Sequence, residues 1–104
     1  MEVEEKFISS LEKAKKNLET ADHLAYITFP IVKENKLLLK VLEEISLSII
    51  NAINAVLQYE YTYKRIRIYQ DAKENFQTFK RISPRYSINQ QHLNTLIEIL
   101  TLTE

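Results

Sequence analysis

The hydrophobic residues at the start of the chain recur with the spacing of an α-helix. They follow one another at alternating intervals of four and three and so share one helical face: Phe7, Leu11, Ala14, Leu18, Ala21 and Ala25. This pattern predicts a first helix from Val3 to between Tyr26 and Thr28. Because a proline disfavours helical geometry at the residue before it and suits the first turn of a helix, we expect the second helix to begin at Pro30.

A longer stripe of apolar residues follows with the same alternating spacing. Its members are Leu38, Leu42, Ile45, Ile49, Ala52, Val56, Tyr59, Tyr63 and Ile66. A stripe of this regularity favours antiparallel packing of the coiled-coil kind. It predicts a long central helix from Pro30 to Ile66.

Two shorter helices are predicted in the last third of the chain. Tyr69, Ala72, Phe76 and Phe79 again lie three and four residues apart, which indicates a third helix over residues 68–81. Residues 65–69 alternate like a strand, but no partner strand is evident, so we interpret them as a helix end or kink. Residues 83–86 read as a loop, and Ser87 with Gln90 has the pattern of a capping box. The last helix then carries its apolar face on Leu93, Leu96, Ile97 and Leu100. The sequence therefore predicts an all-α fold, an antiparallel four-helix bundle with a long second helix, in a single domain over residues 1–104.

The composition narrows the possible chemistry. The 104 residues include no glycine and no cysteine. A glycine-rich phosphate loop, a thiolate metal site and a cysteine nucleophile are therefore excluded. There are two histidines, and the Glu-x-x-His spacing of carboxylate-bridged metal bundles is absent. We expect no metal and no cofactor.

The distribution of charge bears on where the protein works. The longest uncharged stretch, residues 45–59, is short for a membrane helix, which needs about 20 apolar residues. The acidic N-terminus, Met1 to Glu5, does not have the pattern of a secretory signal. With the absence of cysteine, these features predict a cytoplasmic protein that does not enter the membrane.

One face of the predicted central helix is polar although the helix is apolar overall. Its members, on the side away from the expected partner helices, are Glu44, Asn51, Asn54, Gln58, Tyr61 and Arg65. A solvent-facing surface explains them simply. Asparagine is a mediocre helix former, however, so a hydrogen-bonded polar seam of Asn51, Asn54 and Gln58, within the bundle or between subunits, is the alternative.

Basic residues are concentrated between residues 60 and 86. This window holds seven basic and three acidic residues, all four arginines and several tyrosines. Arginine contacts phosphate and tyrosine stacks on bases, so the window has the composition of a single-stranded RNA surface. The candidate binding residues are Tyr61, Arg65, Arg67, Arg81 and Arg85. Alternatively, the arginine stems cover apolar surface near helix ends.

Two segments resemble a known group of helical proteins. "LEKAKKNLETADHL", residues 11–24, is similar to the opening helix of small proteins of the HEPN (higher eukaryotes and prokaryotes nucleotide-binding) superfamily. "LLKVLEEISLSIINAINAVLQYE", residues 38–60, is similar to their long second helix. The likeness covers about the first 60 residues and is greatest to short uncharacterised archaeal members. In the ribonucleases of this superfamily an arginine and a histidine near the last helix cleave RNA across a dimer without a metal. The resemblance implies Arg85 and His92 as that pair.

Two functions follow as hypotheses. The first is a non-catalytic helical binding or assembly module, self-associating as a homodimer or bound to another protein. The second is a HEPN-like protein that binds RNA, or cleaves it without a metal, through the arginine-rich window of residues 60–86.

Overall fold

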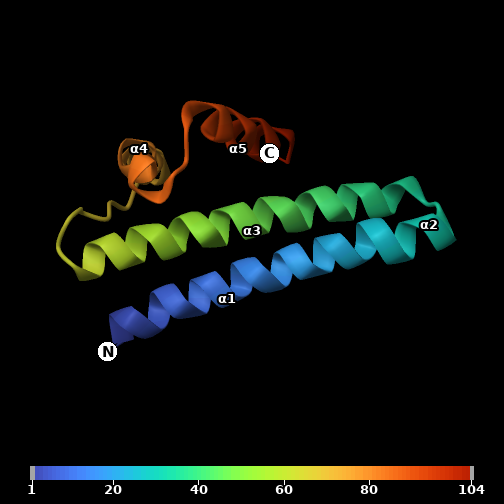
Figure 1. Cartoon of the computed structure of the whole chain (residues 1–104), viewed down its shortest axis with the longest axis horizontal. Helices are drawn as coiled ribbons and strands as arrows, with labels where there is room; N and C mark the ends of the chain where they lie inside the picture. Colours follow the sequence, from blue (N-terminus) through green and yellow to red (C-terminus); the bar gives the residue numbers. More distant parts are fainter. Residues whose placement is uncertain (1, 104) are drawn as a thin grey trace.

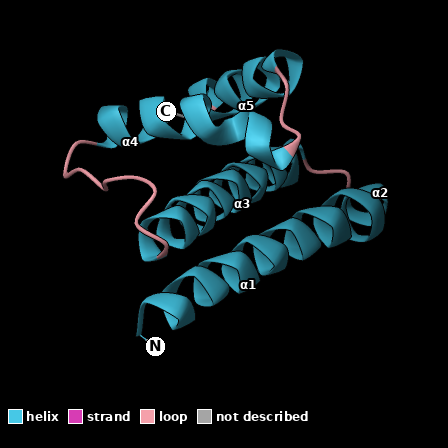
Figure 2. Ribbon diagram, turned by 60° about the vertical axis from the view of Figure 1, so that its left-hand side comes forward, coloured by secondary structure: helices cyan, strands magenta, loops and turns pink. Residues whose placement is uncertain are grey.

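The long helix α3 (Asn35–Thr62) lies in the middle of the molecule. The computed structural model describes the backbone of residues 2–103 and the side chains of residues 6–103. Helix α1 (Glu2–His23) runs antiparallel to α3 on one side, and helices α4 (Ala72–Ile82) and α5 (Gln90–Leu102) lie on the other (Figures 1 and 2). The described residues contain no strand, so the all-α prediction is confirmed. The closed four-helix bundle is not confirmed, because α4 crosses α3, almost end-on in Figure 1, and α3 separates α1 from α5.

Small residues bring α1 and α3 together. Ala14 and Ala21 of α1 and Ala55 of α3 are buried. The distance between two helix axes depends on the side chains at the contact, so alanine permits close approach. The larger members of the same α1 stripe, Leu11 and Leu18, remain exposed. The stripe therefore marks the correct face of α1, but of its members only Ala14 and Ala21 are buried.

The helical segment that begins with α1 continues past Pro30 and ends at Val32. After α1 the chain makes a π-helical turn, η1 (Leu24–Thr28), and a short helix α2 (Phe29–Val32). The expectation that Pro30 opens the long second helix is wrong. Pro30 is instead accommodated in the first turn of α2, where its missing N–H is not needed. The reversal comes at Lys33, which has φ 58° and donates its N–H to the Phe29 carbonyl.

The C-terminal end of α3 also departs from the prediction. The helix ends at Thr62, four residues before Ile66, and Lys64 takes φ 59°. The N–H of Lys64 donates to the Tyr61 carbonyl and that of Arg65 to the Glu60 carbonyl. This is a Schellman motif, a helix end that usually carries glycine in the left-handed position. The chain has no glycine, so lysine occupies the position and the usual sequence signal is missing.

The start of α4 is set by a side-chain cap. Asp71 Oδ1 accepts from the Lys73 N–H, and the helix begins at Ala72 rather than at Ile68. Asn75, within α4, exchanges two 2.7 Å hydrogen bonds with the backbone of Tyr69. These bonds hold residue 69 in the loop before α4, outside the predicted third helix.

The turn between α4 and α5 differs from the predicted loop and cap. Residues 83–86 form a 3₁₀ turn, η2 (Ser83–Tyr86), and Ser87 is left-handed with φ 59°. The capping box is built by Asn89 and His92, not by Ser87 and Gln90. A left-handed residue cannot supply the extended backbone of an N-cap, so the cap moves two residues on, to Asn89.

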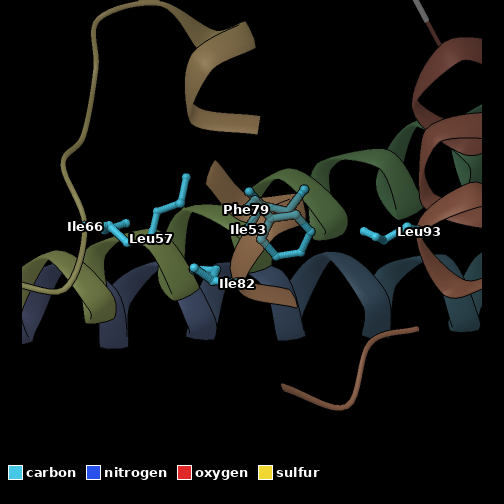
Figure 3. Close-up of a cluster of buried hydrophobic side chains, with 6 residues drawn as sticks. All are labelled: Ile53, Leu57, Ile66, Phe79, Ile82 and Leu93. Carbon is cyan, nitrogen blue, oxygen red and sulfur yellow. The ribbon is translucent and has the colours of Figure 1, made fainter. Parts of the chain in front are cut away.

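The main hydrophobic core lies between α3 and the α4–α5 unit. Its buried members, shown in Figure 3, are Ile53, Leu57, Ile66, Phe79, Ile82 and Leu93. Phe79 and Ile53 lie against each other near its centre, with Leu93 of α5 on one side and Leu57 on the other. Six buried side chains are a small core, and many large hydrophobic side chains remain exposed.

Candidate functional site

A buried carboxylate joins the end of α3 to the turn before α5. Glu60 is 1% exposed and lies one turn beyond Leu57 on the face of α3 that holds the core. Its Oε2 accepts from Tyr86 Oη at 2.8 Å and from Arg65 Nη1 at 3.0 Å, and its Oε1 accepts from Arg85 Nη1. We call these four residues the Glu60 cluster. Arg85 and Tyr86 are its long-range members, since Arg65 is only five residues from Glu60.

The surroundings of Glu60 keep its carboxylate ionised. Burial by itself raises the pKa of Glu60, but the hydrogen bonds from Tyr86 and Arg65 and the two arginine charges outweigh it, so its pKa is lowered. Burial and the bond to Glu60 raise the pKa of Tyr86 to about 12. A carboxylate that stays ionised and has donors on both oxygens is a poor proton acceptor at neutral pH. The cluster is therefore built to link segments rather than to transfer protons.

The five predicted RNA-binding residues fall into two groups. Arg65 and Arg85 bond to Glu60, and the Arg65 guanidinium lies 5.8 Å and 5.3 Å from the ring centres of Tyr59 and Tyr63. Tyr61, Arg67 and Arg81 are exposed. Neither Arg67 nor Arg81 belongs to an ion pair among the described side chains. The window therefore contains both arginines that brace the fold and arginines that face solvent.

Arg85 and His92, the pair implied by the HEPN resemblance, have different partners. Arg85 lies in η2 and points its guanidinium to Glu60. His92 is the third residue of α5, and its Nδ1 accepts from the Asn89 N–H at 3.3 Å. Arg85 thus links η2 to α3, and His92 caps the start of its own helix.

The predicted polar seam is divided between a helix interface and the surface. Asn51 Nδ2 donates to Asn17 Oδ1 at 2.9 Å, and Asn17 Nδ2 donates to Glu44 Oε2 at 2.9 Å. Gln58 Oε1 accepts from Ser10 Oγ at 3.0 Å. Asn51 and Gln58 therefore lie along the contact with α1, whereas Asn54 is exposed.

Asn17 also acts on the charge of Glu44, which is buried beside the seam. Its hydrogen bond, with the bond and charge of Lys40, lowers the pKa of Glu44 against the opposing effect of burial. An ionised carboxylate is therefore retained at the α1–α3 contact. Removing Asn17 would take away the partner of both Asn51 and the Oε2 of buried Glu44, so these bonds help to fix which faces of α1 and α3 meet.

An open apolar groove runs over α3 between α1 and α5. One part of it has a volume of about 480 Å³ and is lined mainly by Leu18 of α1, Ile49 and Val56 of α3, and Leu96 of α5. A second hollow of about 500 Å³ continues toward Ala25 and Val41. Leu18 and Ile45 line both parts, which makes them one groove. We call this surface the α3 groove.

Sequence reasoning missed both Glu60 and the α3 groove. A signal for Glu60 was present, because it is the only acidic residue between Glu44 and Asp71 and shares a helical face with Ile53 and Leu57. The groove had no such signal. Its residues belong to the predicted apolar stripes, and their exposure depends on where α4 and α5 pack.

The described part of the chain lacks two other kinds of site. No helix within it is both long and apolar enough to cross a membrane. Nor do its side chains include a group of three or more His, Asp or Glu placed to hold a metal ion.

Comparisons with protein-family models, with curated proteins and with solved structures gave no match.

Proposed function

We propose that this protein is a non-catalytic α-helical assembly module that acts as a homodimer. The observation that carries the proposal is its large surface. The accessible area is 7742 Å² for a chain of 12.3 kDa. A folded monomer of this mass exposes about 6,100 Å². The Cα radius of gyration, 15.1 Å, likewise exceeds the roughly 13 Å of a compact domain of this length.

Much of this surface is apolar. Large hydrophobic side chains are exposed along both α1 and α3 and at the α2 turn, among them Leu11, Leu18, Tyr26, Ile31, Leu39 and Leu47. Single exposed hydrophobic residues are ordinary, but a continuous apolar groove on a small protein is typical of an interface. Because the small core leaves the α3 groove uncovered, a second protein chain is the natural cover for the groove.

A second copy would complete the bundle that the chain begins. Two antiparallel α1–α3 pairs packed face to face form an antiparallel four-helix bundle, and the two-fold dimer is the commonest symmetric assembly. In that arrangement the α4–α5 unit of each copy stays packed against its own α3. The resemblance to HEPN proteins supports the same assembly, since the family implies a dimer.

Thermal unfolding at two protein concentrations tests the proposal. For a dimer that unfolds to free chains, mass action stabilises the folded state as concentration rises. Between about 5 and 200 μM the Tm should increase by roughly 4 to 8 °C for a chain of this size. An unchanged Tm over this range would argue against a homodimer.

A second candidate function is RNA binding, favoured by the solvent-facing basic residues. Arg67 and Arg81 are exposed, and so are the rings of Tyr61 and Tyr63 in the same part of the sequence. A variant with Arg67→Gln and Arg81→Gln should bind a single-stranded oligonucleotide more weakly. The slope of log affinity against log salt should fall by roughly 1.4, about 0.7 per lost contact. A matched control changes Lys13 and Lys16 of α1 to glutamine and should keep the wild-type slope. Absence of oligonucleotide binding by the wild type at low salt would rule this candidate out.

The same RNA tests the ribonuclease form of this candidate. Cleavage in the presence of a chelator, lost in a His92→Ala variant, would support the Arg85 and His92 pair. Cleavage that survives the loss of His92 would leave a binding surface at most.

A further inference from the structure

We infer that helix α1 of a second copy occupies the α3 groove, in a two-fold contact that places Leu18 of each chain beside its mate. This inference rests on the proposed homodimer and specifies its interface. The groove has the shape for a helix: α3 forms its floor, with Ile45 and Ile49, and α1 and α5 form its walls, with Leu18 and Leu96. A fourth helix laid between these walls would close the apolar interior on all sides.

Helix α1 carries a ridge that matches the groove. Leu18 lines the groove, and Leu11 and Ile8, seven and ten residues before it, are also exposed on the side of α1 away from the polar seam. A ridge beside a groove is self-complementary under a two-fold rotation, because each ridge enters the other groove. A partner with a charged or polar surface would not provide an apolar contact for these three side chains.

The area available matches what a stable dimer needs. The surface of the chain exceeds that of a compact monomer of its mass by about 1,600 Å². A standard interface removes about 800 Å² from each partner, and permanent homodimers remove more. Coverage of the groove and ridge would therefore bring the exposed surface of each copy toward the ordinary value.

The charges beside the ridge are arranged for an antiparallel contact between two α1 helices. Lys15 and Asp22 are exposed and flank Leu18 on α1, three residues before it and four residues after it, and Asp22 also lines the second hollow. A two-fold axis near Leu18 sets Lys15 beside the partner's Asp22, and Asp22 beside the partner's Lys15. Opposite charges in these positions favour this register over a parallel one, which would place like charges together.

Two leucine-to-glutamate variants test the interface. Leu18 is 56% exposed on the groove side, and Leu47 is 45% exposed on the opposite side of α3. Leu18→Glu should convert the wild-type dimer to a monomer in sedimentation velocity, whereas Leu47→Glu should remain a dimer. Because both side chains are exposed, both variants should keep the helical circular dichroism of the wild type.

Cysteine substitution tests the register independently. The chain has no native cysteine, so a single introduced thiol is unambiguous. Leu18→Cys should form an intermolecular disulfide under mild oxidation, because the two Cα atoms would lie within the roughly 7 Å that a disulfide spans. Leu47→Cys should stay reduced.

The possible outcomes separate the interface from the homodimer itself. A wild type that sediments as a monomer overturns the proposed function. A wild-type dimer that survives Leu18→Glu, or that Leu47→Glu dissociates, overturns the α1 interface and leaves the homodimer standing. Efficient crosslinking through Leu47→Cys and none through Leu18→Cys would also overturn it.

Discussion

The variant with Arg85→Met and Tyr86→Phe should lose about 3 to 5 kcal/mol of unfolding free energy, because the Glu60 carboxylate keeps only one of its three donors. A hydrogen bond to a charged group contributes roughly 1.5 to 3 kcal/mol. Arg65, the donor that remains, is close to Glu60 in sequence and does not link α3 to the α4–α5 unit. Both replacements keep most of the side-chain volume, so the loss can be assigned to the polar contacts. Chemical denaturation monitored by circular dichroism measures it.

A third substitution provides the control. Adding Glu60→Gln to the same variant removes the buried charge, and a neutral amide costs less to bury than a carboxylate without partners. The triple variant should therefore be more stable than the double variant. If the double variant unfolds within about 0.5 kcal/mol of the wild type, the Glu60 cluster does not hold the α4–α5 unit to α3.

Ile82→Ala should destabilise the protein by about 2 to 5 kcal/mol, the usual cost of truncating a buried isoleucine. Ile82 is 1% exposed in a core of six buried side chains, so the cavity has few neighbours that can move to fill it. Ile31→Ala is the matched control. Its side chain is 78% exposed, and the same substitution there should change stability by no more than about 0.5 kcal/mol. Equal losses at the two positions would show that Ile31 is covered in solution, as by a partner.

The helical content was predictable because it depends on the spacing of apolar residues. The two long stripes marked α1 and α3, and the runs at Phe76–Phe79 and Leu93–Leu100 marked α4 and α5. Such patterns report which residues share a face whatever that face later meets. Their weakness is that they do not distinguish the members of a stripe that become buried within the chain, such as Ala14 and Ala21, from those that stay exposed, such as Leu11 and Leu18.

Helix boundaries were harder to predict because the chain contains no glycine. The left-handed residues in the described part of the chain are Lys33, Lys64 and Ser87, types that seldom mark a helix end. Each one displaced a predicted boundary: the start of the second helix, its end, and the cap of the last helix. Pro30 did not distinguish a short helix from a long one, because proline fits the first turn of either.

The candidate sites depend on tertiary packing, which the local pattern does not contain. Arg85 and Tyr86 reach Glu60 across 25 and 26 residues, so the arginine-rich window looked like a free surface. The α3 groove exists only because α1 and α5 lie on opposite sides of α3. Both features require the arrangement of the helices to be known first.

The molar mass from sedimentation equilibrium tests the central claim most directly. A single chain has a mass of 12.3 kDa. At tens of micromolar we expect a mass of twice that value, with dissociation toward one chain on dilution. A mass of 12.3 kDa at every concentration would contradict the account, because the apolar groove over α3 would then remain open to solvent.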